Sequence, residues 1–392
     1  MKRNDHASAY PPVELTCEYL VHPLGIEEVK PRLSWRMADP RQGARQTAYH
    51  VQAASSREKL ESGSDLWESG KRKSDQCLDV RYAGKALRSQ QDVFWRVRIW
   101  DASGTVSPWS APATFSMGLL KASDWTGRWI GRPLERKEGS PPSPFLRCAF
   151  NLRDGVRRAR IFVTARGLFE LWMNGQRVGA DYFVPGWTDF NKRIPYLVYD
   201  ATSLVQAGSN TIGAILGDGW YAGYLIWEKK RAHYGDQLSL LLQLEVDYKD
   251  GSHETIRTGP DWKTAVGPIR ESDIYNGETY DARQELPGWD RPDHNDSGWQ
   301  AAVVFDPPKA ALVAKRSYPV RRQEELPVQV QTEPQFGVHV FDLGQNMVGW
   351  ARLKVRANAG DVITIRFAEM LNADGTLYTE NLRSAKATDH YI

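Results

Sequence analysis

The sequence predicts an all-β protein made of tandem β-sandwich domains, and three observations lead to this fold class. Almost no segment carries the sustained apolar period of a helix. Short runs instead alternate apolar with polar residues, as in Phe94–Trp100, and this alternation is typical of a half-buried strand. Gly, Pro, Asn and Asp separate the runs, which indicates hairpins and tight loops between strands.

The first predicted domain covers residues 13–118. Its strongest strand is Phe94–Trp100, and an Asp-Ala-Ser-Gly turn and the segment Ser107-Pro108-Trp109-Ser110 follow it. Trp35 and Trp95 are expected in the core. A buried tryptophan on a central strand, with short alternating strands around it, is typical of a fibronectin type III-like β-sandwich.

Two further β domains are expected after a short linker. Residues 125–305 contain the long strand candidate Leu238–Tyr248, which ends at an Asp-Gly turn. We interpret this range as a jelly-roll-like sandwich of the carbohydrate-binding-module type. Residues 318–392 contain strand candidates at Val338–Asp342, Trp350–Val355 and Val362–Ala368. A jelly roll needs about eight strands, and this range supplies roughly half of them, so we expect an incomplete jelly-roll or concanavalin-like domain.

Composition excludes several classes of protein. The 392 residues include 51 Lys and Arg against 48 Asp and Glu, without a basic stripe, so a nucleic-acid partner is not expected. The three cysteines, Cys17, Cys77 and Cys148, are odd in number and widely spaced, which argues against a disulfide framework and a zinc site. No signal peptide and no membrane span is visible. We therefore expect a cytoplasmic protein without a membrane partner.

The segment from Phe169 to Gly223 is the best candidate for a functional site. Asn-Gly, Pro-Gly and Asp-Gly pairs interrupt its apolar runs, and tryptophans stand beside the breaks. Trp187, Trp220 and Tyr221 are predicted to bind carbohydrate, because a flat ring covers a pyranose face while nearby polar groups bind hydroxyls. The same rings would be equally at home in a sandwich core, and that alternative stays open.

Several ordered motifs carry a resemblance to a known family. They are PRLSW (31–35), FWRVRIWD (94–101), NGQRVG (174–179), PGWTDFNKR (185–193), LGDGWYAG (216–223), GETYDAR (277–283), FDLGQNMVGW (341–350) and FAEMLNADGTLYTENLRSAKATDHY (367–391). From about residue 13 to the last residue, the chain resembles the N-terminal part of bacterial α-L-rhamnosidases of glycoside hydrolase family 78.

The resemblance implies a modular enzyme in which β-sandwich domains precede an (α/α)6 toroid. In the family, that toroid hydrolyses terminal α-L-rhamnosyl units with inversion by means of paired acidic residues. Nothing in the 392 residues resembles the toroid, so we expect no catalytic residue here and no hydrolase activity of the chain alone. The expected role is to bind or position rhamnosylated glycans and to scaffold a catalytic domain supplied elsewhere. The alternatives are a freestanding rhamnose-binding protein and an inactive, truncated remnant whose unpaired strand edges promote association.

The resemblance also raises the possibility of calcium, since some family members carry a calcium-assisted rhamnose site; no cofactor is otherwise required. Asn174 and Asp218 are the candidate carbohydrate and calcium ligands, with Asp189 and Asn191 as further oxygen donors if their loops converge. The alternative is that Asn174 and Asp218 are plain turn residues, because a glycine follows each of them.

The remaining polar candidates favour structural roles. Glu278 and Asp281 stand close together with Arg283, and an ion network or a contact with a catalytic domain is favoured over an acid/base pair. The same interpretation applies to Asp342 and Glu369. His233 and Tyr234 are expected on a loop rim. No phosphate-binding loop, metalloprotease motif or nucleophile motif is present.

Overall fold

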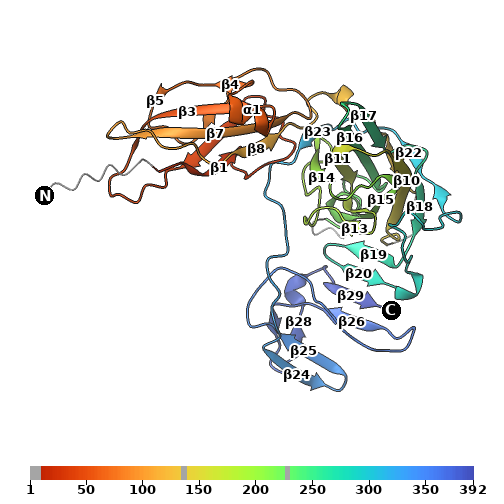
Figure 1. The fold of residues 1–392 in the computed structure, drawn as a ribbon. Coiled ribbons are helices and arrows are strands. Elements are labelled where there is room, and N and C mark those ends of the chain that lie inside the picture. The colour runs from red at the N-terminus through yellow and green to blue at the C-terminus, as the bar shows by residue number, and fades with distance from the viewer. Residues whose placement is uncertain (1–9, 134–138, 226–229) are drawn as a thin grey trace. The chain divides into compact units, whose positions relative to one another are not determined.

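The structure, a computed structural model, describes residues 10–133, 139–225 and 230–392. The described chain is almost entirely β-structure (Figure 1), so the all-β, tandem-sandwich prediction is confirmed. It divides into two compact units, Met1–Trp125 with Ala314–Arg316, and Thr126–Val313 with Ser317–Ile392. Among the described residues, no helix has the length and apolar character needed to cross a bilayer.

Unit 1 is a small β-sandwich. Its elements are β1 (Val13–Cys17), β2 (Arg32–Arg36), β3 (Gln46–Ala54), α1 (Arg57–Ser62), β4 (Trp67–Glu68), β5 (Arg72–Lys73), β6 (Val80–Arg81), β7 (Asp92–Asp101), β8 (Ala113–Ser116) and the 3-10 turn η1 (Ala122–Asp124). One sheet has the order β1-β2-β6 and the other β4-β3-β7-β8, with β5 added to β3. Trp35 and Trp95 are buried between the sheets, as predicted, and the Trp35 indole N–H donates to Gln46 Oε1 at 2.9 Å.

Unit 2 is built on a larger sandwich. Its elements are β9 (Trp129–Gly131), β10 (Pro144–Leu152), β11 (Val156–Arg166), β12 (Leu168–Met173), β13 (Gln176–Arg177), β14 (Arg193–Asp200), β15 (Gly208–Gly217), α2 (Gly219–Ala222), β16 (Ser239–Tyr248), β17 (His253–Arg257), β18 (Lys263–Val266), β19 (Ile269–Asp273), β20 (Gly277–Tyr280), η2 (Ala282–Gln284), β21 (Gln300–Ala301), β22 (Val303–Phe305) and β23 (Ala311–Ala314). One sheet has the order β13-β12-β15-β10-β18-β21, and the other β22-β9-β16-β11-β14-β23, with β17 on β16.

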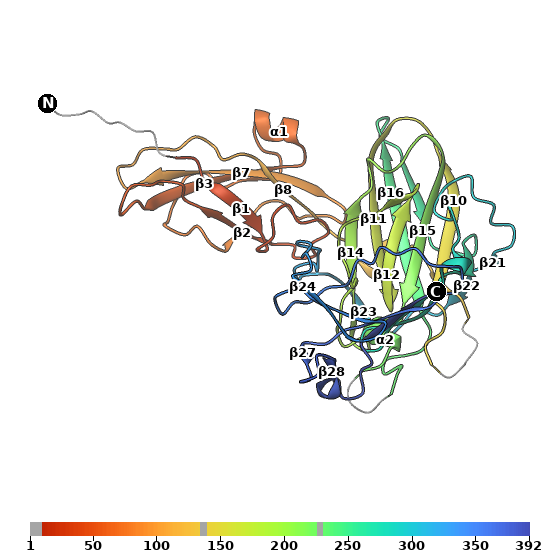
Figure 2. The same ribbon diagram turned by 90° about the horizontal axis from the view of Figure 1, so that it is seen from below.

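The two large sheets enclose the core of unit 2 (Figure 2). Strands β11 and β16 pair antiparallel from Arg158–Asp247 to Arg166–Ser239, and both are buried over most of their length. A strand buried on both faces reads as a continuous apolar run rather than an alternating one, as in Leu240–Leu242 of β16. The core therefore lies between the two sheets at the centre of the sandwich. The loops at the ends of the sandwich are not needed for this core and are free to carry function.

The C-terminal segment of unit 2 contains β24 (Val330–Gln335), β25 (Val338–Asp342), β26 (Ile363–Arg366), β27 (Met370–Leu371), β28 (Leu377–Tyr378), η3 (Glu380–Leu382) and β29 (Thr388–Tyr391). No residue from 315 to 392 is buried. The prediction of a strand at Trp350–Val355 is wrong. This segment is exposed, and no strand among the described residues pairs with it to complete its backbone hydrogen bonds.

A mixed four-stranded sheet joins this segment to the sandwich. Its order is β19-β20-β29-β26, in which β29 runs parallel to β20 and antiparallel to β26. The rings of Tyr280 and Tyr391 stack with centroids 5.7 Å apart. Glu278 N donates to Asp389 Oδ1 at 2.8 Å. Residues 318–392 are thus attached to the range 125–305 by backbone pairing.

The same sheet half-buries the Glu278 carboxyl. Burial, together with the nearby carboxylates of Asp389 and Glu170, raises the pKa of Glu278 to about 7. Glu170 itself lies 3.5 Å from the guanidinium of Arg177. No cation of the described residues forms an ion pair with Glu278, so the charged form of its carboxyl is disfavoured at the joint.

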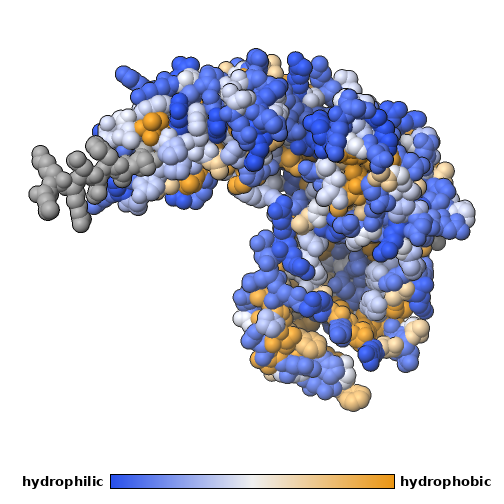
Figure 3. Space-filling view, in the orientation of Figure 1, coloured by the Kyte–Doolittle hydropathy of each residue, from blue (hydrophilic) through white to orange (hydrophobic). Residues whose placement is uncertain are grey.

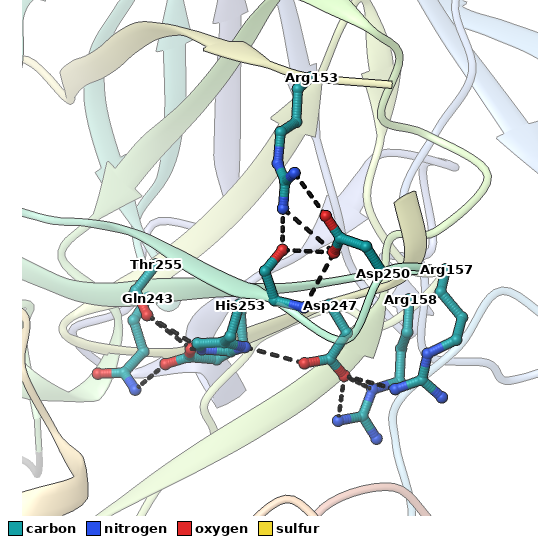
Figure 4. Close-up of polar contacts among 10 residues, drawn as sticks. Arg153, Arg157, Arg158, Gln243, Asp247, Asp250, His253 and Thr255 are labelled. Carbon is teal, nitrogen blue, oxygen red and sulfur yellow. Dashed lines mark hydrogen bonds and ion pairs between the residues drawn. The ribbon is translucent and has the colours of Figure 1, made fainter. Parts of the chain in front are cut away.

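A polar network covers the outer face of the β16–β17 hairpin (Figure 4). His253 Nε2 lies 2.6 Å from Glu245 and Nδ1 lies 2.9 Å from Asp247, while Arg158 donates to Asp247 at 2.7 Å. Burial opposes a charge on His253, but the hydrogen bonds to Asp247 and Glu245 outweigh it and raise the pKa of the imidazole.

We expect His253→Gln to destabilise unit 2 more at about pH 5.5 than at about pH 8.5. A histidine with a raised folded-state pKa contributes stability that is fully present below its unfolded pKa and is lost as the pH rises through the folded value. The side chain is partly exposed, so the effect should be about 0.5–1 kcal/mol. Calorimetric melting at both pH values measures it, with the exposed His339→Gln as the control. A loss of equal size at the two pH values would contradict the assignment.

We expect Glu278→Gln to stabilise unit 2 at about pH 8 and to have little effect near pH 4. The pKa of Glu278 in the folded chain lies above that of a glutamate in the unfolded chain. Its contribution to the free energy of unfolding is therefore fully present below the unfolded-state pKa and is lost as the pH rises through the folded-state pKa near 7. The gain at high pH should be about 2–3 kcal/mol. Calorimetric melting across this pH range, with Glu271→Gln on the exposed face of β19 as a control, tests the expectation. Destabilisation at high pH would show that the carboxylate is needed in its charged form.

Candidate carbohydrate-binding site

An aromatic cluster lies at one end of the unit 2 sandwich. Strand β15 leads directly into the single helical turn α2, so α2 marks this end (Figure 2). The loop before β14 reaches the same end, because Phe169 N, near the start of β12, donates to Val184 O at 3.0 Å. Two segments that the sequence separates by about thirty residues therefore meet here.

Trp187 and Trp220 form the exposed part of the cluster. Their rings are parallel within 6° and their centroids are 6.2 Å apart. Trp187 is 55% exposed, and its indole N–H lies 3.4 Å from the hydroxyl of Tyr234. Phe183 is exposed beside Trp220, with ring centroids 6.0 Å apart. We call Phe183, Trp187 and Trp220 the aromatic platform.

The backbone of α2 sets the direction of Trp220. Gly219 has φ of +52°, and a Cβ at this position would lie 2.4 Å from Leu168 Cγ, so only glycine fits. Ala222 N and Gly223 N close the turn on Asp218 O and Gly219 O. Trp220 is left partly exposed while Tyr221 and Ala222 are buried.

Tyr221 supports the platform from below. Its ring is buried and packs edge-on against Phe190, with centroids 5.4 Å apart, and Phe190 in turn contacts Tyr234 at 5.2 Å. Burial raises the pKa of the Tyr221 hydroxyl, although the neighbouring Arg166 opposes the shift. The structure thus places the predicted carbohydrate ligand Tyr221 in the supporting layer, where its ring face is not free to stack on a sugar.

Asp218 is also a supporting residue. It is 2% exposed, accepts a hydrogen bond from Ser140 Oγ at 2.6 Å and forms an ion pair with Arg231. Burial raises the pKa of its carboxyl, whereas Arg231 and Ser140 favour the charged form. The Asp218–Arg231 pair ties the loop that carries His233 and Tyr234 to the start of α2.

Asn174 lies at the other end of the sandwich from Asp218. In the register of β12 and β15, Leu168 pairs with Gly217 and Met173 with Ile212, so roughly 17 Å of strand separates the two turns. Asn174 has φ of +51°. Its amide donates to Leu204 O and Asn210 Oδ1 at 2.9 and 2.8 Å and accepts from Thr211 N at 2.8 Å.

The structure therefore does not bring Asn174 and Asp218 together, and the prediction of a calcium site that uses both residues is wrong. Asp189 binds Asn191 N at 3.1 Å and Lys192 Nζ at 3.3 Å within its own turn. Within residues 10–133, 139–225 and 230–392, no group of three or more His, Cys, Asp or Glu side chains is arranged to hold a metal ion.

The other polar candidates lie apart from the platform. Arg283 binds Asp281 through two hydrogen bonds of 2.8 and 2.9 Å and lowers the pKa of this carboxyl to about 2, which is the ion pair favoured from the sequence. Asp342 accepts from Gly344 N at 2.7 Å, and Glu369 is exposed. His233 packs against Tyr234 with ring centroids 4.7 Å apart.

Sequence reasoning missed two aromatic members of the cluster, Phe183 and Phe190, and placed Tyr234 only on a loop rim, whereas its hydroxyl lies beside Trp187. The signal that could have found the first two is aromatic density, because Tyr182, Phe183, Trp187 and Phe190 fall within nine residues. Trp172, which also stands beside a turn, lies elsewhere and packs against Trp289 at 6.5 Å. Its register partner Gly213 lies near the Asn174 end of β12.

Three family models match successive parts of the chain. Residues 12–121 match the Rha78A-like, N-terminal immunoglobulin domain, residues 154–324 the alpha-L-rhamnosidase N-terminal domain, and residues 332–392 the bacterial alpha-L-rhamnosidase concanavalin-like domain. The models follow one another in the order of the β domains described above. The match thus extends over most of the chain.

Curated relatives with this similarity are alpha-L-rhamnosidases. One from Formosa agariphila is 40% identical over 380 residues, which cover 95% of this chain and 41% of the relative. One from Streptomyces avermitilis is 34% identical over 543 residues, covering 95% of this chain and 52% of the relative. The chain thus spans about half the length of the curated relatives that it matches, or less.

Solved structures agree with this result. The alpha-L-rhamnosidase of Streptomyces avermitilis complexed with L-rhamnose superposes with a TM-score of 0.92 at 33% identity, over 97% of this chain and 53% of that one. The enzyme of Dictyoglumus thermophilum gives 0.91 at 36% identity, over 98% and 44%. The order of the domains, the sequence identity and the fold all agree, and the chain belongs to the α-L-rhamnosidases of glycoside hydrolase family 78, where it corresponds to their N-terminal β-domain region.

Proposed function

We propose that this chain is the accessory β-domain region of an α-L-rhamnosidase and that its aromatic platform binds rhamnosylated glycans. The observation that carries the proposal is the pair of parallel indole rings, of which Trp187 is more than half exposed. An exposed ring of this kind covers the apolar face of a pyranose. L-Rhamnose suits it well, because its C6 is an apolar methyl group where an ordinary hexose carries a hydroxymethyl group.

Polar groups beside the platform complete a sugar site. The Tyr234 hydroxyl lies within reach of the Trp187 indole N–H, and Thr188 Oγ1 accepts from Arg193 Nε at 2.9 Å close by in the same loop. A mostly apolar surface with a few fixed hydrogen-bonding groups is the usual composition of a small-ligand site. The supporting layer of Phe190 and Tyr221 packs against Tyr234, which borders the platform.

A second role, as a scaffold for the catalytic part of the enzyme, is supported by the C-terminal segment. None of its side chains from 315 to 392 is buried, and large apolar residues are exposed on β24, β25 and the chain that follows: Val330, Phe336, Val338, Phe341, Met347, Val348, Trp350, Leu353 and Val355. Apolar atoms gather in this part of unit 2 in Figure 3. A contiguous apolar surface of this kind favours burial against further polypeptide.

We expect Trp187→Ala to weaken L-rhamnose binding about tenfold, because the sugar loses its stacking surface. Calorimetric titration of the 392-residue chain with L-rhamnose and with a rhamnose-terminated oligosaccharide measures the effect. Phe336→Ala removes an exposed ring outside the platform and should leave the affinity unchanged. Heats should be the same with calcium and with a chelator.

If Trp187→Ala binds L-rhamnose with unchanged affinity, the aromatic platform is not the binding site. A parallel assay with an aryl α-L-rhamnoside tests for hydrolysis, and none is expected from this chain alone. Enzyme-like turnover would contradict the accessory role, because it would place two catalytic carboxyl groups within these 392 residues.

We expect limited proteolysis to cut the chain after about Pro319 before it cuts the sandwich of unit 2. The exposed backbone of residues 320–392 has few buried contacts that would oppose local opening. Mass spectrometry of early fragments identifies the first cuts. If the segment from 330 to 392 resists protease as long as β11 and β16 do, its apolar surface is covered within the chain itself, and the scaffold role loses its support.

A further inference from the structure

A row of cations and tryptophans covers the outer face of β7 in unit 1. The burial of β7 alternates strictly, so Arg96, Arg98 and Trp100 share the outward face. Trp109, from the loop before β8, packs against both arginines, with guanidinium carbons 4.6 and 4.5 Å from its ring centroid. The ammonium group of Lys71 lies 4.4 Å from the centroid of Trp100.

Lys73 extends the row onto the neighbouring strand β5. It pairs with Ala48 of β3, which pairs in turn with Trp100 of β7, and cross-strand partners lie on the same face of a sheet. Lys71 and Lys73 are both exposed. We call Lys71, Lys73, Arg96 and Arg98 the cationic strip.

Within the described residues, the cations of the strip are not held in ion pairs. None of the four residues forms an ion pair with a carboxylate of the described chain. Arg96 Nε donates to the neutral Gln52 at 2.9 Å, and Arg98 donates to His50 Nδ1 at 3.3 and 3.1 Å. The terminal nitrogens of Arg96 have no hydrogen-bond partner among the described residues.

The neighbouring carboxylate Glu68 is committed to other groups. It is paired with His50 and accepts hydrogen bonds from Gln52 at 2.9 Å and from Ser64 at 2.7 Å. Because His50 Nδ1 accepts from Arg98, the neutral imidazole carries its proton on Nε2, toward Glu68. Burial, and then the charge of Arg98, lower the pKa of Arg96, while the charges of Glu68 and Glu61 oppose the shift. The four cations of the strip outnumber these two carboxylates, so a net positive charge remains.

The tryptophans hold three of these cations in a fixed arrangement. Cation–π contacts stabilise the ammonium group of Lys71 over Trp100 and the guanidinium groups of Arg96 and Arg98 over Trp109. Little entropy of these three side chains therefore remains to be lost when an anion binds. Arg96 and Arg98 occupy alternate positions of one strand, roughly 7 Å apart. Such a row is complementary to a polymer that carries anionic groups at regular intervals.

We propose that the cationic strip binds an acidic glycan, a polysaccharide with carboxylate or sulfate groups. The choice of a glycan among polyanions rests on the proposed function, since an accessory region of a glycosidase meets polysaccharide. The strip lies in unit 1 and shares no residue with the aromatic platform. It would hold the charged backbone of a substrate whose neutral rhamnosyl ends are bound elsewhere.

The test is affinity electrophoresis of the 392-residue chain in gels that contain polygalacturonate, dextran sulfate or neutral dextran. Retardation is expected with one or both acidic polymers and not with dextran, and it should decrease as salt is added. Polygalacturonate and dextran sulfate distinguish a carboxylate ligand from a sulfate ligand. Lys71→Gln with Lys73→Gln should weaken binding about fivefold.

Lys30→Gln with Lys85→Gln is the matched control, because it removes two exposed lysines of unit 1 outside the strip. Equal retardation of the two double variants would overturn the proposal, as would equal affinity for an oligonucleotide of the same charge. L-Rhamnose binding is measured in parallel. If the chain binds L-rhamnose but is not retarded by the acidic polymers, only the proposal for the cationic strip is contradicted. If Trp187→Ala loses L-rhamnose binding but is still retarded, the strip binds the acidic polymer independently of the aromatic platform.

Discussion

The pairing of β12 with β15 is the constraint on which the candidate site depends. Its register places Leu168 opposite Gly217, so the chain must turn immediately beyond this pair. Gly219 makes that turn because a side chain there would collide with Leu168, and the single turn of α2 then directs Trp220 outward and Tyr221 inward. A shift of one residue in this register would exchange the two faces of the strands and displace the turn that carries the partly exposed Trp220.

The same pairing separates residues that look equivalent in the sequence. Asn174-Gly175 and Asp218-Gly219 are both turn pairs, but they terminate opposite ends of one β-ladder. Asn174 uses its whole amide to connect the ends of β12 and β15, whereas Asp218 is buried against Arg231 and Ser140. Both side chains hold loops in place, and the exposed chemistry belongs to the aromatic rings at the Asp218 end of the sandwich.

The two units illustrate different uses of a sheet face. In unit 2 both faces of β11 and β16 are covered, and one end of the sandwich carries the aromatic platform. In unit 1 the outer face of β7 stays open, and Trp109 orders the arginines on it. The C-terminal segment differs from both, because it is held to the sandwich by the β20–β29 pairing while its own apolar side chains remain uncovered.

The sequence by itself determined the all-β fold, the burial of Trp35 and Trp95, and the family. It also shows the density of aromatic residues around Pro185-Gly186. These features could be predicted because alternation, turn pairs and ordered motifs are local properties of the chain. Only the tertiary structure decided which aromatic rings meet, since Trp187 and Trp220 come together through the register of distant strands. It also assembled the cationic strip, although the sequence contains no basic stripe: Lys71, Lys73, Arg96 and Arg98 become neighbours only when β5, β3 and β7 pair. The strand expected at Trp350–Val355 failed for the corresponding reason, because an alternating segment becomes a strand only where a neighbour satisfies its backbone hydrogen bonds.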